Sequence, residues 1–103
     1  MNTCTRSDYS SEKHDQDKAP LVRGCFRYFP DALEGIAFVS GYGAVKYNVE
    51  FEDFAWRYVL HGKNRYLDAD GRHLIRDGYD DESGYLHAAH HAWDAVAVLQ
   101  LLL

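Results

Sequence analysis

The feature that most constrains this chain is its last third, residues 72–103. Four of the six histidines lie there, interleaved with acidic residues: His73, Asp80, Asp81, Glu82, His87, His90, His91 and Asp94. After Asp94 almost every residue is apolar. A helix that is apolar on all sides must be buried on all sides, and a chain this small can hardly cover one. We therefore expect this end of the chain to pack against a second subunit, which predicts a homo-oligomer.

Composition limits the other possibilities. With 103 residues and 47% hydrophobic residues, the chain is long enough for one small domain, predicted over 20–103 after a flexible polar tail, 1–19. A net charge of -5 argues against general nucleic-acid binding. Two cysteines and no apolar leader favour the cytoplasm. No apolar run is long enough to cross a membrane.

Apolar periodicity predicts an all-α fold, a small bundle of about four helices after an extended N-terminal lead-in over 21–29. The expected helices are Pro30–Ser40, ended by Gly41, a second from Glu50 through Val59, a third over Arg65–Asp77 and a fourth from Ser83 to the end. Oligomerisation would use this last helix.

The histidines have the spacing of a metal site. His87 and His91 are four residues apart, so a helix places both on one face, where two imidazoles commonly hold a divalent ion. His73 could add a third nitrogen, and Asp81 and Glu82 could add oxygen ligands of the kind that Mg²⁺ or Mn²⁺ prefers. The alternative is that Asp81 caps a helix and the histidines are half-buried hydrogen-bonding residues.

Basic and aromatic residues in the middle of the chain could complete a nucleotide site. Lys46, Arg57 and Arg72 could neutralise phosphate charge, although each could equally belong to a solvated surface. Tyr47 and Trp56, on either side of the second predicted helix start, are candidates for stacking on a base. No glycine-rich phosphate loop of the G-x-x-x-x-G-K-[ST] kind is present.

Several blocks of sequence carry a resemblance. They are Lys18-Ala19-Pro20-Leu21, Gly43-Ala44-Val45-Lys46-Tyr47, Ala55-Trp56-Arg57, Tyr66-Leu67-Asp68-Ala69-Asp70-Gly71-Arg72-His73-Leu74 and Asp80-Asp81-Glu82-Ser83-Gly84-Tyr85-Leu86-His87-Ala88-Ala89-His90. In these blocks the chain resembles a phage and bacterial family of small helical domains, the N-terminal domains of dATP/dGTP diphosphohydrolases, loosely grouped with MazG-like pyrophosphatases. Ala55 and Asp94 stand where that family commonly has asparagine.

The resemblance implies metal-dependent hydrolysis of a purine deoxynucleoside triphosphate to the monophosphate and pyrophosphate. The implied metal is Mg²⁺ or Mn²⁺, with Zn²⁺ as an alternative, and the implied ligands are His73, Asp81, Glu82, His87 and His91. Glu82, Asp81 and His73 would be the catalytic residues. Lys46, Tyr47, Trp56, Arg57 and Arg72 would bind the substrate. The alternative function is a non-enzymatic phage protein that sequesters a nucleotide signal of host defence, which the loss of asparagine at Ala55 would fit.

Overall fold

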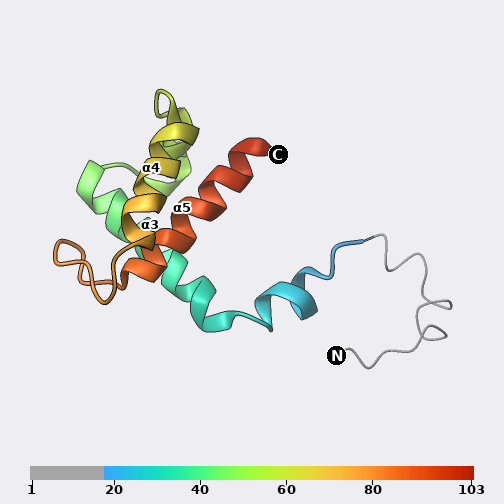
Figure 1. Ribbon diagram of the computed structural model, residues 1–103. Helices are drawn as coiled ribbons and strands as arrows, with labels where there is room; N and C mark the ends of the chain where they lie inside the picture. The colour runs from blue at the N-terminus through green and yellow to red at the C-terminus, as the bar shows by residue number, and fades with distance from the viewer. Residues whose placement is uncertain (1–17) are drawn as a thin grey trace, which may run out of the picture. The chain divides into compact units, whose positions relative to one another are not determined.

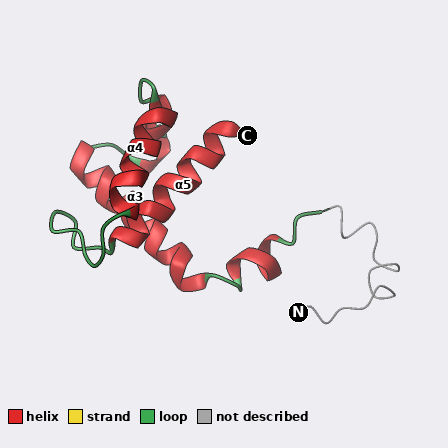
Figure 2. Cartoon of the chain, in the orientation of Figure 1, coloured by secondary structure: helices red, strands yellow, loops and turns green. Residues whose placement is uncertain are grey.

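The computed structural model describes residues 18–103, so nearly all of the tail predicted over 1–19 lies outside the described residues. The described residues divide into two units, which meet between Asp31 and Ala32. Within the described residues the regular structure is entirely helical, as Figure 2 shows. The all-α fold class predicted from periodicity is therefore confirmed.

In the first unit, residues Val22–Phe26 form a short π-helix, η1. The prediction of an extended lead-in was wrong here. The amide of Gly24 donates to the carbonyl of Pro20 at 2.7 Å, and the amide of Arg27 donates to the carbonyl of Val22 at 2.8 Å. The segment thus satisfies its backbone groups locally, which an isolated extended segment cannot do.

Helix α3 spans Pro30–Tyr47 and begins at the predicted proline. It does not end at Gly41, as the sequence predicted, but continues through Gly41 and Gly43. An interior glycine costs a helix only about 1 kcal/mol relative to alanine, and tertiary packing can outweigh that cost. Here Val39 is buried, and Ser40 accepts a hydrogen bond from the indole of Trp93 at 2.8 Å.

The segment after α3 contains two short 3-10 helices instead of the predicted second α-helix. These are η2, Phe51–Asp53, and η3, Ala55–Tyr58. Between them Phe54 has φ of 50°, a left-handed conformation that interrupts any continuous helix. The apolar spacing in this segment is helical, but the backbone turns in the middle of the pattern.

Helices α4, Gly62–Leu74, and α5, His87–Leu102, lie side by side as a helical hairpin (Figure 1). The third predicted helix exists, but it starts and ends three residues early. The fourth begins at His87, because residues 75–86 form a loop. An antiparallel bridge between Tyr79 and Leu86 closes this loop, and Gly78 and Gly84 have φ of 76° and 80°.

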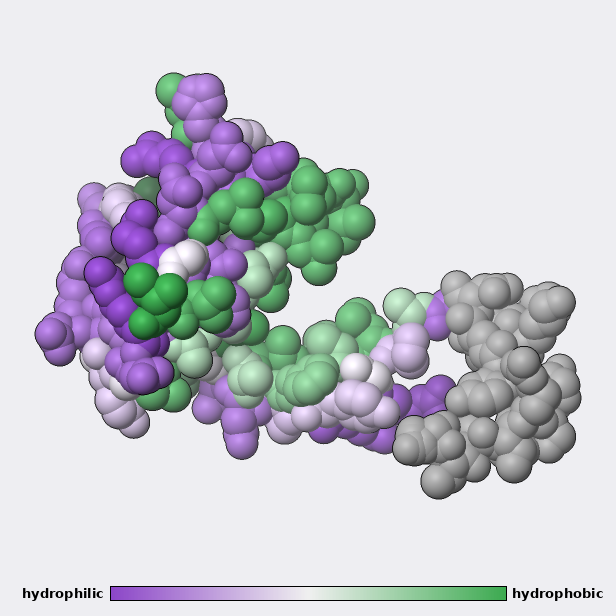
Figure 3. Space-filling view, in the orientation of Figure 1, coloured by the Kyte–Doolittle hydropathy of each residue, from purple (hydrophilic) through white to green (hydrophobic). Residues whose placement is uncertain are grey.

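The core is small and unusually polar. Among the described residues, the buried apolar side chains are Val39, Ala97 and Val98, and the buried polar ones are His87, His90 and Asp94. Apolar side chains instead gather on the surface at the C-terminal end of α5 (Figure 3), where Leu102 is 63% exposed. Across residues 18–103, no helix combines the length and apolarity needed to cross a bilayer.

Candidate functional site

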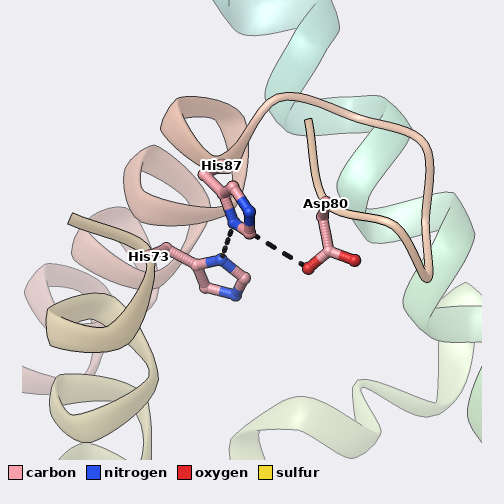
Figure 4. Close-up of side chains that lie close together, drawn as sticks. All are labelled: His73, Asp80 and His87. Carbon is pink, nitrogen blue, oxygen red and sulfur yellow. Dashed lines mark hydrogen bonds and ion pairs between the residues drawn. The ribbon is translucent and has the colours of Figure 1, made fainter. Parts of the chain in front are cut away.

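Three metal-ligand side chains converge where α4, the loop and α5 meet. His73 lies in the last turn of α4, Asp80 in the loop, and His87 is the first residue of α5 (Figure 4). The Nδ1 atoms of His73 and His87 are 2.9 Å apart, and His87 Nδ1 lies 3.9 Å from a carboxylate oxygen of Asp80. One donor atom from each residue lies within 4.8 Å of the other two.

The loop holds Asp80 in this position through its own backbone. One carboxylate oxygen of Asp80 accepts the amides of Glu82 and Ser83 at 2.7 and 3.1 Å, which leaves the other oxygen directed toward His87. Burial acts to raise the pKa of Asp80, but these two amides together with His90 and His87 outweigh it, so its pKa is lowered. Asp80 is therefore ionised at neutral pH, as a metal ligand must be.

His73 is also suited to be a ligand. Burial, followed by the neighbouring His90 and His87, lowers the pKa of His73, so the imidazole is neutral at pH 7. Its ring stacks on that of His90 with the centroids 4.6 Å apart. His90 in turn contacts Ser83 Oγ through Nε2 at 2.7 Å, and burial lowers its pKa as well. The stack fixes the plane of the His73 ring against its neighbours.

This donor set fits a divalent ion. Two atoms each about 2.1 Å from one ion are at most about 4.2 Å apart, and the separations of 2.9 and 3.9 Å around His87 Nδ1 lie below that bound. The two facing Nδ1 lone pairs need either one shared proton or a cation between them. Two imidazoles and a carboxylate are typical ligands of Mn²⁺, Zn²⁺ and Fe²⁺.

An open hollow of about 360 Å³ lies beside the three ligands. It is lined by Arg76, Asp80, Asp81, Glu82 and His87. The two predicted catalytic carboxylates, Asp81 and Glu82, thus lie at the same hollow as His87, one of the three histidines predicted to bind the metal. The arrangement offers metal ligands, a free carboxylate and one guanidinium at a single opening large enough for a phosphate chain.

Glu82 has partners of its own on α3. Its carboxylate accepts hydrogen bonds from Lys46 Nζ at 2.7 Å and from the hydroxyl of Tyr42 at 2.6 Å. Lys46, followed by Tyr42, lowers the pKa of Glu82. Lys46, predicted to bind phosphate, is therefore already paired with a carboxylate, and the pair ties the loop to the C-terminal end of α3.

Other predicted site residues lie apart from this centre. His91 Nδ1 contacts a carboxylate oxygen of Asp70 on α4 instead of joining the three ligands. Trp56 packs against Tyr66 and Trp93 beside a second hollow of about 200 Å³.

The remaining predicted substrate-binding residues also lie outside the first hollow. Arg57 lies over the ring of Trp56 at 6.0 Å, and Tyr47 is exposed with Lys46 Nζ 5.4 Å from its ring centre. Arg72 is exposed on α4 next to His73 but does not line the hollow.

Sequence reasoning missed Asp80 as a ligand and Arg76 as a lining residue. Asp80 could have been found, because an aspartate two and three residues before Glu82 and Ser83, ahead of Gly84, has the spacing of a side-chain-to-backbone turn. Such a turn fixes the direction of the aspartate side chain. Arg76 gives no such signal, because its position depends on where α4 ends.

Residues 8–103 match the family model of the dATP/dGTP diphosphohydrolase N-terminal domain. The chain belongs to this family. No curated protein and no solved structure matches it. For the diphosphohydrolase N-terminal domain, the match spans the three candidate ligands and the whole lining of the hollow, which lie between residues 73 and 87.

Proposed function

We propose that this domain binds a purine deoxynucleoside triphosphate and a divalent ion, and hydrolyses the nucleotide to the monophosphate and pyrophosphate. One observation carries the proposal: His73, Asp80 and His87 direct donor atoms to one point at the edge of a hollow that can hold phosphates. The name of the family, dATP/dGTP diphosphohydrolase, supports the substrate and the reaction.

The donor set favours Mn²⁺ or Zn²⁺ over Mg²⁺, because Mg²⁺ prefers oxygen ligands and two of the three donors are imidazole nitrogens. The sequence alone favoured Mg²⁺ or Mn²⁺, so Mn²⁺ is common to both arguments. When bound, such an ion supplies Lewis acidity that draws charge from phosphate oxygens and lowers the pKa of water.

The acidic residues at the hollow take different roles in this proposal. Asp81 is exposed and lines the hollow, so its carboxylate can accept the proton of a water that attacks the α-phosphorus. The bond from the α-phosphorus to the bridging oxygen then breaks, and pyrophosphate leaves. Glu82, held by Lys46 and Tyr42, keeps the loop in place. Tyr47 is exposed next to Lys46, which contacts Glu82 of the hollow, so it is the predicted aromatic residue that a base would stack on.

A second function, nucleotide binding without turnover, is favoured by a different observation. The matching family model describes an N-terminal domain, so the chemistry of the family can depend on residues outside the matched region. A protein that only sequesters a nucleotide needs the hollow and the metal ligands but no general base. The two functions make opposite predictions for the fate of the bound nucleotide.

Self-association through α5 forms part of the proposal. Val96, Leu99, Leu102 and Leu103 are between 50% and 91% exposed, and no charged residue follows Asp94 in the chain. Contiguous apolar surface of this kind typically marks a protein interface. A second copy that covers it would also compensate for the small core of each chain.

The test begins with metal binding by isothermal titration calorimetry. Asp80→Asn is the sharpest variant, because asparagine can still accept the amides of Glu82 and Ser83 but lacks the negative charge. We expect this variant and His87→Ala to lose Mn²⁺ binding. His61→Asn is the matched control, since His61 is exposed with φ of 56°, which asparagine tolerates.

Turnover is then measured with dATP and dGTP in Mn²⁺, by chromatography of the solution before and after heat denaturation of the protein. A monophosphate that forms with the wild type and not with Asp80→Asn supports hydrolysis. A nucleotide that disappears and returns intact on heating identifies the binding function. Wild-type protein that binds neither Mn²⁺ nor nucleotide would contradict both functions.

A further inference from the structure

Arg76 lies at the hollow in a way that the other basic residues do not. It lies two residues after the end of α4, and its amide donates to the carbonyl of His73 at 3.2 Å, which ties its backbone to that of a candidate metal ligand. Its side chain is the one lysine or arginine among the described residues that line the hollow. The others are Asp80, Asp81, Glu82 and His87.

The side chain of Arg76 also forms no ion pair with the described residues. In the described part of the chain, residues 18–103, no carboxylate lies within 4.0 Å of its guanidinium, although three carboxylates line the same hollow. The side chain is exposed, so its five N–H donors are open to a ligand. Lys46, by contrast, is 2.7 Å from Glu82 and already neutralised.

An unpaired arginine beside the candidate metal ligands is suited to one ligand chemistry. A phosphate chain carries several negative oxygens along its length, so one phosphate can face an ion held by His73, Asp80 and His87 while another accepts the fork of a guanidinium. Orthophosphate has only one phosphate group for both contacts, whereas a polyphosphate can give a separate group to each. The lining offers no phenylalanine, tyrosine or tryptophan ring and no asparagine or glutamine side chain that would read a base at the same place.

We propose that Arg76 is a phosphate-binding residue and that the hollow recognises the polyphosphate chain of the nucleotide, jointly with the ion at His73, Asp80 and His87. The inference rests on the proposed function and assigns the selectivity of this hollow to the number of linked phosphates. Base recognition then belongs to another surface of the protein. Arg76, instead of Arg72, one of the three basic residues predicted for this role, takes the phosphate charge.

The experiment uses inorganic tripolyphosphate, which has the phosphate chain but no base. Calorimetry first measures Mn²⁺ binding alone, and then tripolyphosphate binding in saturating Mn²⁺, so that chelation of the ion by the probe is the same for every variant. Orthophosphate is titrated in parallel. The variants are Arg76→Gln, Arg76→Lys, Arg72→Gln and, as a control at the exposed start of α4, Arg65→Gln.

We expect Arg76→Gln to bind Mn²⁺ like the wild type and to bind tripolyphosphate about 10- to 100-fold more weakly, the usual effect of losing a charged hydrogen-bond donor. Arg76→Lys should recover part of the affinity, and orthophosphate should bind far more weakly than tripolyphosphate. Arg65→Gln should match the wild type.

The possible failures can be told apart. Equal tripolyphosphate affinity for Arg76→Gln and the wild type, with normal Mn²⁺ binding, would overturn the role of Arg76 and leave the metal site intact. A loss confined to Arg72→Gln would return the phosphate contact to the residue predicted from sequence. Wild-type protein that binds no Mn²⁺ would instead remove the proposed function and this inference with it.

Discussion

Replacing Asp94 with asparagine should make the stability of this domain less sensitive to pH. Asp94 lies on α5, is only 6% exposed, and has its pKa raised from 3.8 to about 7, mainly by burial and then by the nearby carboxylate of Asp70. Arg72 and His91 act in the opposite direction but do not cancel the effect. The folded chain therefore holds a proton on Asp94 at pH values where the unfolded chain has lost it.

The sign and the size follow from that difference. An acid whose pKa is raised by folding costs nothing below its unfolded pKa, and the cost grows as pH rises until it passes the folded pKa. Each pKa unit corresponds to about 1.4 kcal/mol. Between pH 5 and pH 8 the wild type should lose about 3 kcal/mol of unfolding free energy through Asp94. At about 4–8 °C per kcal/mol for a chain of this size, this loss lowers Tm by more than about 10 °C.

The assay is urea denaturation followed by circular dichroism at pH 5, 6, 7 and 8, with a chelator present so that no bound ion contributes. Asp94→Asn should be more stable than the wild type at pH 8 and should lack its decline between pH 5 and pH 8. Asp68→Asn, an exposed carboxylate on α4, should follow the wild type. Parallel curves for the wild type and Asp94→Asn would refute the reasoning, because they would show that Asp94 does not change its ionisation on folding.

Two further predictions concern the backbone and the surface. Gly35→Ala should stabilise the domain by about 0.5–1 kcal/mol in urea denaturation, since Gly35 is interior to α3 and nothing lies within 4 Å of an added Cβ. Gly84→Ala should destabilise the domain by about 1 kcal/mol or more, because Gly84 has φ of 80°. Two variants of equal stability would contradict the assignment of these conformations. If α5 is the self-association surface, Leu99→Glu should lower the sedimentation coefficient measured by analytical ultracentrifugation. Glu34→Gln, at an exposed position of α3, should leave the coefficient unchanged. An unchanged assembly in Leu99→Glu would exclude that surface.

The helical class of this chain could be predicted from sequence, but several helix ends could not. Pro30 marks the start of α3 because a proline lacks the N–H that the first turn does not use. Gly41 failed as a stop signal, because its cost is small compared with the packing of the helix that surrounds it. Phe54 failed in the opposite direction, since a left-handed backbone at an apolar residue has no sequence signal.

The candidate site shows a similar division. The sequence grouped His73 with His87 and His91 as candidate ligands. The structure brings His73 and His87 together but places His91 against Asp70. The sequence carries a turn signal for Asp80, whose carboxylate accepts the amides of Glu82 and Ser83. It carries no such signal for Glu82, whose side chain is directed by a hydrogen bond from Tyr42, a residue 40 positions away that only the fold brings near.

Polar contacts between α4 and α5, His91 with Asp70 and His73 with His87, affect how uniquely the two helices pair. An interface of leucines can slide by one helical turn, about 5.4 Å, and still bury similar surface. Here such a slip would separate His91 from Asp70 and His73 from His87, and leave buried polar groups without partners. We therefore expect these polar contacts to permit a single register of the two helices, at a lower stability than an apolar interface would give. Mutations that replace these histidines with leucine would then yield a domain that is harder to unfold but in which α4 and α5 can pair in more than one register.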